Sequence, residues 1–401
     1  MEKVDGVLVV GAGPVGIITA LGLARAGIPV RILEAEPDIV VSPRAVVYHW
    51  SVLESMDRLG ILEDLKSTGF IKQDYQYRVL DDSEVFDFDL SPLEGHTPYP
   101  YNVHLGQHLL ARLALTHLER LQGDVARWNS RVVAVEQDDN GVTATVETAE
   151  GTKQYCGKWL IGADGGRSGV RSALDLAFEG FTWPDRFVAT NLWYDFEKHG
   201  FARSTLILDP VNWAVLAKID ETNLWRCTYG EDASLPEEEM VQRVPEHYKF
   251  FLPGNEPYKL EMVGPYRLHQ RAVESFRVGR VVLAGDAAHV TNPVGGLGLT
   301  TGLFDAFALA PTMAAVIHGE EDQSVLDQWA ADRRRIFLDI VSPAATDNKR
   351  RMSESDPERQ KQDRARLRRV CEDRDFALQA HMFTKSIESQ PYVGRKLGEA
   401  A

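Results

Sequence analysis

The 401-residue chain contains only three cysteines, and their spacing fits neither a disulfide framework nor a metal motif. Cys156, Cys227 and Cys371 are therefore expected to be reduced thiols, which favours a cytoplasmic location, and we expect no metal site. Positive charge is also scarce, because 44 Lys and Arg stand against 59 Asp and Glu, for a formal net charge of -15. This balance argues against nucleic acid or an anionic membrane as the main partner.

We also expect no membrane span. The apolar run at 7–24 contains five interrupting residues, has no basic leader and has no cleavage site. It is typical instead of a buried strand, a glycine turn and a buried helix. With 44% hydrophobic and 26% charged residues, the chain can form a folded core, and its length predicts two or three structural units.

The N-terminal pattern predicts a βαβ unit, with strands at 7–10 and 30–34 around a helix that ends near residue 26. Between the first strand and the helix lies Gly11-Ala12-Gly13-Pro14-Val15-Gly16. Its glycines allow a tight turn, the approach of a pyrophosphate to the backbone and close helix–strand packing. Glu34 ends the second strand and can accept hydrogen bonds from a ribose. The pattern predicts dinucleotide binding without distinguishing NAD from FAD.

Farther along, helices are expected at 50–59 and 107–121, and a hairpin at 131–147 with its turn at 138–141. Residues 181–262 hold four Trp, six Phe and four Tyr, and their alternation predicts antiparallel strands at 204–208, 213–219 and 224–229. A buried strand at 281–284, a second glycine-rich turn and a helix at 302–318 follow. The highly charged end of the chain, 346–401, is expected to be a helical segment.

Two later segments distinguish FAD from NAD. They are Trp159-Leu160-Ile161-Gly162-Ala163-Asp164-Gly165-Gly166-Arg167-Ser168 and Arg280-Val281-Val282-Leu283-Ala284-Gly285-Asp286-Ala287-Ala288-His289, the latter followed by Pro293 and Gly295-Gly296-Leu297-Gly298. With the N-terminal fingerprint and Arg44, they resemble the single-component FAD-dependent aromatic hydroxylases of the para-hydroxybenzoate hydroxylase family, over about residues 7–345. Segments 189–196, 224–231 and 265–271 more loosely resemble its branch of para-nitrophenol monooxygenases and phenol-type hydroxylases.

The resemblance implies an α/β fold, in which a Rossmann-like FAD-binding domain with a mixed sheet is interleaved with an antiparallel substrate-binding sheet. We expect the FAD-binding domain at 1–75, 101–180 and 263–345, the substrate domain at 76–100 and 181–262, and the helical segment at 346–401. The resemblance also implies noncovalent FAD. The residues expected to bind it are Gly11, Gly13, Pro14, Val15, Gly16, Glu34, Arg44, Gln107, Asp164, Arg167, Gly285, Asp286, Pro293, Gly296, Gly298 and Leu299.

The implied reaction is hydroxylation of a phenol, with nitrophenols among the candidates, using NAD(P)H and O₂ through a flavin hydroperoxide. There is no second G-x-G-x-x-G, so the nicotinamide nucleotide is expected to dock on the same surface as FAD. The acidic run at 34–38 would repel a 2′-phosphate, which favours NADH over NADPH. The partners expected are a small aromatic substrate and O₂, and a homodimer is left open.

The substrate residues are less defined than the FAD residues. Pro293 is expected to line the reaction cavity, and Tyr229 to bond a phenolate if its face of the strand at 224–229 looks inward, which the sequence leaves open. Trp213 and Trp225 could sandwich a ring on that sheet, and His199 and His269 are the histidines expected near it. Arg203 and Arg226 are candidate cations for a substrate carboxylate.

Other functions remain open on the same fold. The main alternative is an FAD-dependent reductase without oxygen transfer, which would favour a long apolar groove over an aromatic sheet. A flavin halogenase would carry Trp-x-Trp-x-Ile-Pro, which this chain lacks. A flavin-binding regulator would show no turnover of NAD(P)H and O₂ with any phenol.

Overall fold

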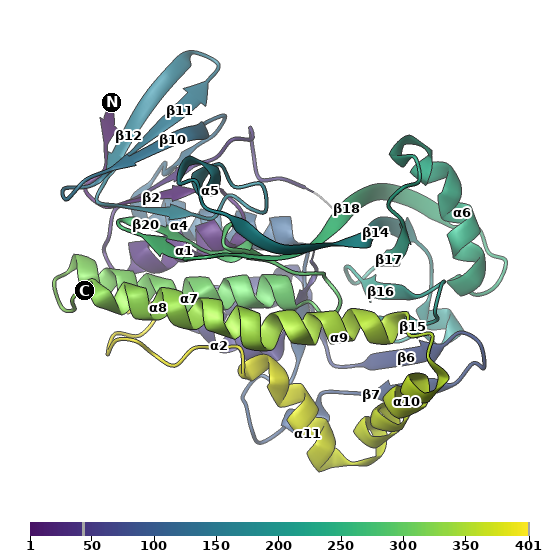
Figure 1. Cartoon of the computed structure of the whole chain (residues 1–401). Helices are drawn as coiled ribbons and strands as arrows, with labels where there is room; N and C mark the ends of the chain where they lie inside the picture. The colour runs from purple at the N-terminus through teal and green to yellow at the C-terminus, as the bar shows by residue number, and fades with distance from the viewer. Residues whose placement is uncertain (42–44, 400–401) are drawn as a thin grey trace.

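The computed structural model describes residues 1–41 and 45–399, so Arg44 lies outside the described residues. Figure 1 shows two sheet-based parts side by side, with long helices running beneath them. One part holds a mostly parallel sheet, the other a larger and mostly antiparallel one. The α/β fold predicted from the sequence is confirmed.

The first part is built on a six-stranded sheet in the order β19-β20-β13-β2-β3-β9. Strands β20, β13, β2, β3 and β9 run parallel, and β19 is antiparallel. Helix α1 packs against α4 and α7, which bury the apolar strands. The bounds are β2 Val7–Val10, α1 Pro14–Arg25, β3 Val30–Leu33, α4 Gln107–Gln122, β9 Ala126–Arg127, β13 Trp159–Gly162, α5 Gly169–Ala173, β19 Arg277–Val278, β20 Val281–Leu283 and α7 Leu297–Ile317.

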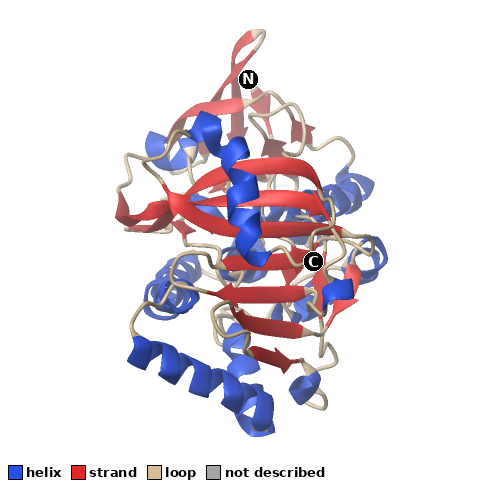
Figure 2. Ribbon diagram, turned by 90° about the vertical axis from the view of Figure 1, so that its right-hand side faces the viewer, coloured by secondary structure: helices blue, strands red, loops and turns tan. Residues whose placement is uncertain are grey.

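The second part is an eight-stranded sheet in the order β21-β18-β14-β17-β16-β15-β6-β7. Figure 2 shows a helix lying across its outer face, and this helix is α6, Met240–Phe251. The strands are β6 Tyr75–Val79, β7 Val85–Phe88, β14 Phe178–Trp193, β15 Ser204–Leu208, β16 Ala214–Lys218, β17 Leu224–Asp232, β18 Lys259–Val273 and β21 His289–Val290. Strands β14 and β18 run through both boundaries proposed near residues 180 and 262, so that division stays a prediction.

Two smaller sheets complete the strands. The predicted hairpin is found as β10 Arg131–Gln137 and β11 Val142–Thr148, which join β12 Gly151–Gly157 and β1 Glu2–Lys3. In its turn, the Asp138 carboxylate accepts the N–H groups of Asn140 and Gly141. The other sheet joins β4 Val47–Tyr48, β8 Asn102–His104 and β5 Phe70–Lys72, and lies next to α2 Trp50–Arg58 and α3 Leu62–Thr68.

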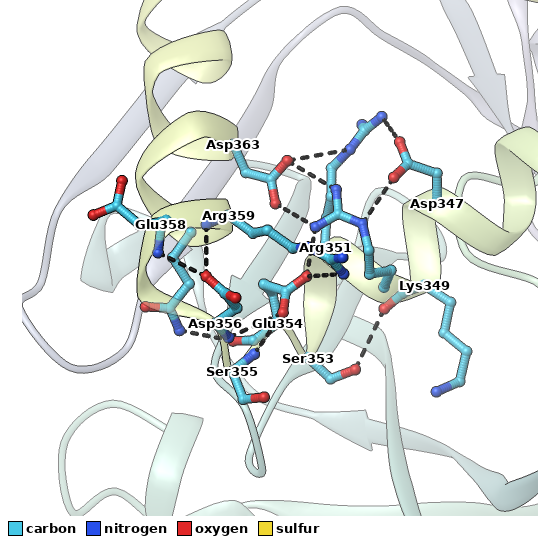
Figure 3. A network of polar contacts seen from close by, with 12 residues as sticks. Asp347, Lys349, Arg351, Ser353, Glu354, Ser355, Asp356, Glu358, Arg359 and Asp363 are labelled. Carbon is cyan, nitrogen blue, oxygen red and sulfur yellow. Dashed lines mark hydrogen bonds and ion pairs between the residues drawn. The ribbon is translucent and has the colours of Figure 1, made fainter.

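The charged C-terminal segment is helical, as predicted, and ion pairs hold it to the protein. Its helices are the end of α9 Ser342–Met352, then α10 Pro357–Glu372 and α11 Arg374–Met382, and α8 Ser324–Ile336 precedes the segment. Asp363 of α10 binds Arg350 of α9 at 2.7 Å, within the network drawn in Figure 3. Arg364 and Arg368 of α10 reach Asp82 and Glu84, beside the large sheet. The charges of this segment therefore serve attachment as well as solvation.

Helix α7 begins five residues before the predicted start at 302, because the glycine turn leads into it directly. It is long and apolar enough to cross a membrane, but 78% of its most apolar window is buried inside the protein. Its residues belong to the main hydrophobic core, together with strands β2, β13 and β20. Burial of a core helix therefore accounts for its hydropathy.

Candidate active site

The three predicted motifs meet at one edge of the parallel sheet. Gly11 follows β2, Ala163 follows β13 and Ala284 follows β20, and these three strands are adjacent and parallel. Glu34 follows β3, the next strand. The carboxyl edge of an open parallel sheet is where such folds bind nucleotides. Segments up to about 270 residues apart in the sequence thus form one surface.

The glycine fingerprint has the geometry that a pyrophosphate requires. At Gly11, where φ is +104°, a Cβ atom would lie 2.4 Å from the Ala163 carbonyl oxygen, and at Gly16 it would lie 2.2 Å from that of Gly11. At Gly13, by contrast, a Cβ would meet no atom of the described residues within 4 Å. Gly13 is the N-cap of α1, and no described side chain caps this helix end. The free N–H groups of α1 therefore have open space in front of them for phosphate.

Glu34 binds the fingerprint turn. Its carboxylate accepts the Ala12 N–H at 2.6 Å and the Glu36 N–H at 2.9 Å. Each carboxylate oxygen keeps a further lone pair, so ribose hydroxyls could still donate to it. Pro14 is buried at the first position of α1, while Val15 packs within 3 Å of where a Cβ on Gly285 would lie. Val15 thus joins the first motif to the third.

Asp164 of the second motif has a structural set of partners. It accepts Ser168 Oγ–H at 2.5 Å and the N–H groups of Gly169 and Val170, at the start of α5. Burial raises the pKa of Asp164 above its usual value, and these hydrogen bonds oppose that change. Arg167 is exposed beside it and available to a ligand. Asp164 would therefore contribute to FAD binding by holding the loop at 164–170 in place.

Sequence reasoning gave no role to Arg171, which connects the second and third motifs. It is 8% exposed and donates to the carbonyl oxygens of Ala287 and Gly166. The sequence feature that could have pointed to Arg171 is its position directly after the second motif, in the pair Val170-Arg171.

A buried charge cluster holds the third motif from behind. Asp305 of α7 is fully buried and accepts the Gly285 N–H at 2.9 Å, His289 Nε2–H at 2.7 Å and Arg333 Nε–H at 2.7 Å. Burial alone would raise the pKa of Asp305, but the charges of His289 and Arg333 outweigh it and lower that pKa. The cluster fixes the turn from which Asp286 projects, exposed, at the carboxyl end of β20. An exposed carboxylate there suits the hydroxyls of a ribityl chain.

The second glycine-rich turn forms the N-terminus of α7. Gly296 is its N-cap with φ +67°, no side chain caps the helix, and Pro293 lies exposed before it. Gly298 and Leu299 are half-buried in the first turn, so their N–H groups are among those a helix start leaves unpaired. His49 Nε2–H donates to the Gly295 carbonyl oxygen at 3.0 Å. Unpaired N–H groups on a long helix suit the partial negative charge of a flavin's pyrimidine edge.

The remaining expected FAD residue, Gln107, is half-buried at the first position of α4. The next residue, His108, has its pKa lowered by burial and by the charge of Arg226 on the large sheet. The start of α4 therefore lies near that sheet as well as near α1. Residues able to hold each part of FAD are thus present among those the structure describes.

The large sheet has two different faces. Phe187 is paired with Gly230, and Asn191 with Arg226, so these side chains share one face, which we call the inner face. Trp213 packs on Phe187 with ring centroids 4.8 Å apart, and Val294 of the glycine loop joins the same cluster. The inner face therefore adjoins the loop that suits a flavin. Arg226 there donates to Asn191 Oδ1, and burial lowers the pKa of its guanidinium to about 10.

The outer face carries Trp225 and Tyr229, which pair with Leu192 and Val188 and pack under α6. Tyr229 stacks on His247 of α6 with centroids 4.2 Å apart. The predicted sandwich of a ring between Trp213 and Trp225 is therefore wrong, because the two side chains lie on opposite faces. Trp213 lies just before β16 and packs on Phe187, whereas alternation along β17 puts Trp225 on the outer face, and the sequence could not tell which face looks inward.

The two candidate histidines have protein partners. His199 Nε2 lies 2.8 Å from the Glu256 carboxylate, near the loop after α6. His269 Nδ1 is 2.8 Å from Thr182 Oγ1, and burial and three arginines lower the pKa of its imidazole. These contacts explain both side chains without a ligand, so their substrate roles stay predictions. Among the described residues, no three His, Cys, Asp or Glu side chains form a group that could hold a metal.

Comparisons with known proteins agree with this geometry. Residues 5–344 match the model of the family described as FAD binding domain. Over the full length of both chains, 44% of residues are identical to para-nitrophenol 4-monooxygenase of Pseudomonas sp. strain WBC-3. Over 97% of this chain and 100% of the relative, 45% are identical to 6-hydroxy-3-succinoylpyridine 3-monooxygenase of Pseudomonas putida.

A solved structure is similar throughout. The crystal structure of p-nitrophenol 4-monooxygenase PnpA from Pseudomonas putida DLL-E4 superposes with a TM-score of 0.94, at 41% identity, covering 97% of this chain and 100% of that chain. The likeness includes the large sheet and the C-terminal helices as well as the part with the parallel sheet. The chain belongs to the FAD-binding domain family and, within it, to the single-component flavin-dependent aromatic hydroxylases.

Proposed function

We propose that this flavin-dependent monooxygenase uses NAD(P)H and O₂ to hydroxylate a simple phenol, with 4-nitrophenol the first candidate. The observation that carries this proposal is the arrangement of the nucleotide-binding edge and the inner face, which meet at the loop from Pro293 to Leu299. Similarity over the full length to para-nitrophenol 4-monooxygenase supports the substrate class. A reductase without oxygen transfer is not favoured by these relatives.

When bound, FAD supplies the redox chemistry that passes electrons from the nicotinamide to O₂. The chain itself would bind the pyrophosphate at Gly13, orient the ribityl chain at Asp286 and offer the N–H groups at the start of α7 to the flavin. The inner face positions the aromatic ring and keeps water away with Phe187 and Trp213. We also propose that the enzyme acts in the cytoplasm, since its three cysteines are free thiols.

A second substrate class has its own support. Arg226 is half-buried on the inner face and its guanidinium binds the neutral Asn191 amide. A guanidinium in that position can bind a carboxylate, so a hydroxypyridine with an acidic side chain is the alternative. The relative named 6-hydroxy-3-succinoylpyridine 3-monooxygenase has such a substrate in its name.

The coenzyme preference for NADH remains our proposal, with a weaker basis than the sequence suggested. The Asp38 carboxylate is bound at 2.7 Å by Arg112, and Glu36 has Arg131 at 3.7 Å. Part of the acidic charge at 34–38 is therefore neutralised, and repulsion of a 2′-phosphate is reduced.

The decisive experiment measures aerobic oxidation of NADH and NADPH by the FAD-loaded enzyme, with and without phenols and hydroxypyridines. Product, nitrite and catalase-sensitive peroxide are measured together. Oxidation stimulated by 4-nitrophenol with a matching oxygenated product supports the proposal, whereas stimulation with peroxide alone means that the true oxygen acceptor is another compound. A panel with no stimulation by any hydroxylated ring would refute it.

A further inference from the structure

The small sheet β4-β8-β5 carries buried polar side chains that the FAD-binding motifs do not use. His104 on β8 pairs with Phe70, and Lys72 on β5 pairs with Asn102, so His104, Asn102 and Lys72 share one face. All three are at most 1% exposed. Asn102 is satisfied, because its amide accepts the Trp50 N–H and contacts the Tyr75 hydroxyl. Lys72 and His104 are not.

Lys72 is a buried amine whose Nζ has no hydrogen-bond partner among the described residues. It lies over the Tyr75 ring, 2.9 Å from the centroid. Burial, the main cause, lowers the pKa of the Lys72 amine well below its usual value, which favours the uncharged form. A buried ammonium without an anion is costly, and a carboxylate or phenolate beside it would remove that cost.

His104 supplies an unused lone pair. Its Nδ1 is 2.8 Å from the Lys218 carbonyl oxygen, which can only accept, so Nδ1 carries the hydrogen. Nε2 is then an acceptor, and it is buried with no hydrogen-bond partner among the described residues. Burial and the charge of Lys72 lower the pKa of His104 to about 3, which keeps the ring neutral.

This pair lies close to the loop that suits the flavin. His49 donates to Gly295 of that loop, and a Cβ on Gly296 would lie 3.0 Å from His49 Nε2. His49 directly follows β4, in which Val47 pairs with His104 of β8, so the small sheet connects the pair to that loop.

We propose that Lys72 and His104 form the binding site for the substrate's phenolic oxygen, with Lys72 as the base that removes its proton. The phenol O–H bond breaks, an N–H bond forms at Lys72 Nζ, and the phenolate remains beside the new ammonium. Net charge in the buried site is unchanged and no electrons leave it. His104 Nε2 is not bonded to Lys72, so its lone pair is left to accept the phenol O–H before the proton moves to the amine. The inference rests on the proposed function and deepens it.

Other groups around the pair also affect its titration. Asp74 raises the pKa of Lys72 and Arg203 lowers it, while the charge of Lys72 lowers the pKa of His381 on α11. The titratable or charged groups that interact with this pair from the neighbouring elements are His49, Asp74, Tyr75, Arg203 and His381. None of these is a carboxylate bonded to Lys72 Nζ, which leaves that position to the substrate oxygen.

The test follows ionisation of bound 4-nitrophenol by its visible phenolate absorption, using the full-length FAD-loaded enzyme over a pH series. Wild type should ionise the bound ligand at a lower pH than free ligand. In Lys72→Met the apparent pKa of bound 4-nitrophenol should rise by about one unit or more, with about a tenfold loss of affinity. Affinity for 4-nitroanisole, which has no phenolic proton, should not change.

Lys153→Met on the exposed strand β12 is the matched control and should leave both ligands unaffected. Lys72→Met should fold, since it replaces a buried amine by an apolar chain of similar length, and Lys72→Gln is the second variant if it does not. Unchanged ionisation in the variant, or an equal loss for both ligands, would overturn the inference. If wild type hydroxylates no phenol or hydroxypyridine, the proposed function itself fails, and these two failures are distinct.

Discussion

The nucleotide-binding edge and the substrate sheet differ in how their sequence defines a site. At the edge, the groups offered to a ligand are largely backbone N–H groups, and glycine is required where atoms approach closely, as at Gly11 and Gly16. On the large sheet, the groups offered are side chains whose face depends on strand register, which puts Arg226 on the inner face and Tyr229 on the outer face. A short local pattern therefore marks the first site, whereas the second exists only after residues distant in sequence have been brought together.

The largest expected effect separates folding from ligand binding inside one glycine motif. Gly16→Ala places a Cβ 2.2 Å from the Gly11 carbonyl oxygen, so we expect the apoprotein to lose about 3 kcal/mol of unfolding free energy. Gly13→Ala meets no atom within 4 Å in the part of the chain that the structure describes, and should stay within about 0.5 kcal/mol of wild type. It should nevertheless weaken FAD about tenfold or more, because the methyl group occupies the phosphate side.

Urea unfolding of the apoproteins and titration of FAD fluorescence check these two variants. Equal stability losses in both would mean that the open space at Gly13 has a structural role. Unchanged FAD affinity in Gly13→Ala would remove this turn from the cofactor site and undo the comparison.

The next effect concerns the charge cluster behind the third motif. Asp305→Asn leaves Arg333 buried without its anion, so we expect a loss of about 3–5 kcal/mol. Asp327→Asn, whose carboxylate is 66% exposed and pairs with Arg277, should cost at most about 1 kcal/mol. The pKa of Asp305 is lowered below 3.8 in the folded state. The contribution of Asp305 to the free energy of unfolding is therefore fully present above pH 3.8 and is lost as the pH falls further.

Thermal unfolding of the two variants between pH 3 and 7 measures this contribution. FAD should also dissociate faster from Asp305→Asn, since asparagine has only one acceptor oxygen for the three donors of Gly285, His289 and Arg333. A variant as stable as Asp327→Asn, with wild-type FAD retention, would show that the turn does not depend on this cluster.

The contrast between a site marked by a local pattern and a site formed by distant segments also explains which features the sequence could predict. The βαβ unit, the hairpin at Asp138 and helix α4 follow from local periodicity and turn chemistry, and the structure confirms them. The predicted start of helix α7, at residue 302, was too late, because the glycines at its N-terminus carry no helical periodicity. Asp305, Arg333 and Arg171 were missed as site residues, since each acts through contacts between segments far apart in the chain.

The substrate residues show the same limit more clearly. Trp225 and Tyr229 share a face, as alternation predicted, but that face packs under α6 rather than toward the glycine loop. Lys72 and His104 gave no signal, because nothing in Phe70-Ile71-Lys72 or Asn102-Val103-His104 indicates that two short strands pair and bury their polar side chains together. Burial without a partner is a property of the folded chain.

A smaller effect distinguishes the two substrate classes on the inner face. Arg226→Met removes the guanidinium while keeping an apolar chain, so affinity for a hydroxypyridine carboxylate should fall about tenfold to a hundredfold, as for a charged hydrogen bond of about 1.5–3 kcal/mol. Affinity for 4-nitrophenol and for FAD should change little. Arg131→Met, whose side chain is 62% exposed, is the control. Equal losses for both ligands would indicate that Arg226 supports the sheet through Asn191 rather than recognising a carboxylate.

The smallest effect is expected at Tyr229, and it tests the assignment of the two faces. Its hydroxyl is buried without a hydrogen-bond partner among the described residues, so Tyr229→Phe should unfold within about 0.5 kcal/mol of wild type or be slightly more stable. Tyr248→Phe, which loses a 2.5 Å bond to Thr190, should cost about 1 kcal/mol. Both variants should keep the wild-type rate of phenol hydroxylation, measured by product formation. A tenfold loss of that rate in Tyr229→Phe alone, with FAD retained, would place the substrate on the outer face, because packing under α6 gives the hydroxyl no other route to the chemistry.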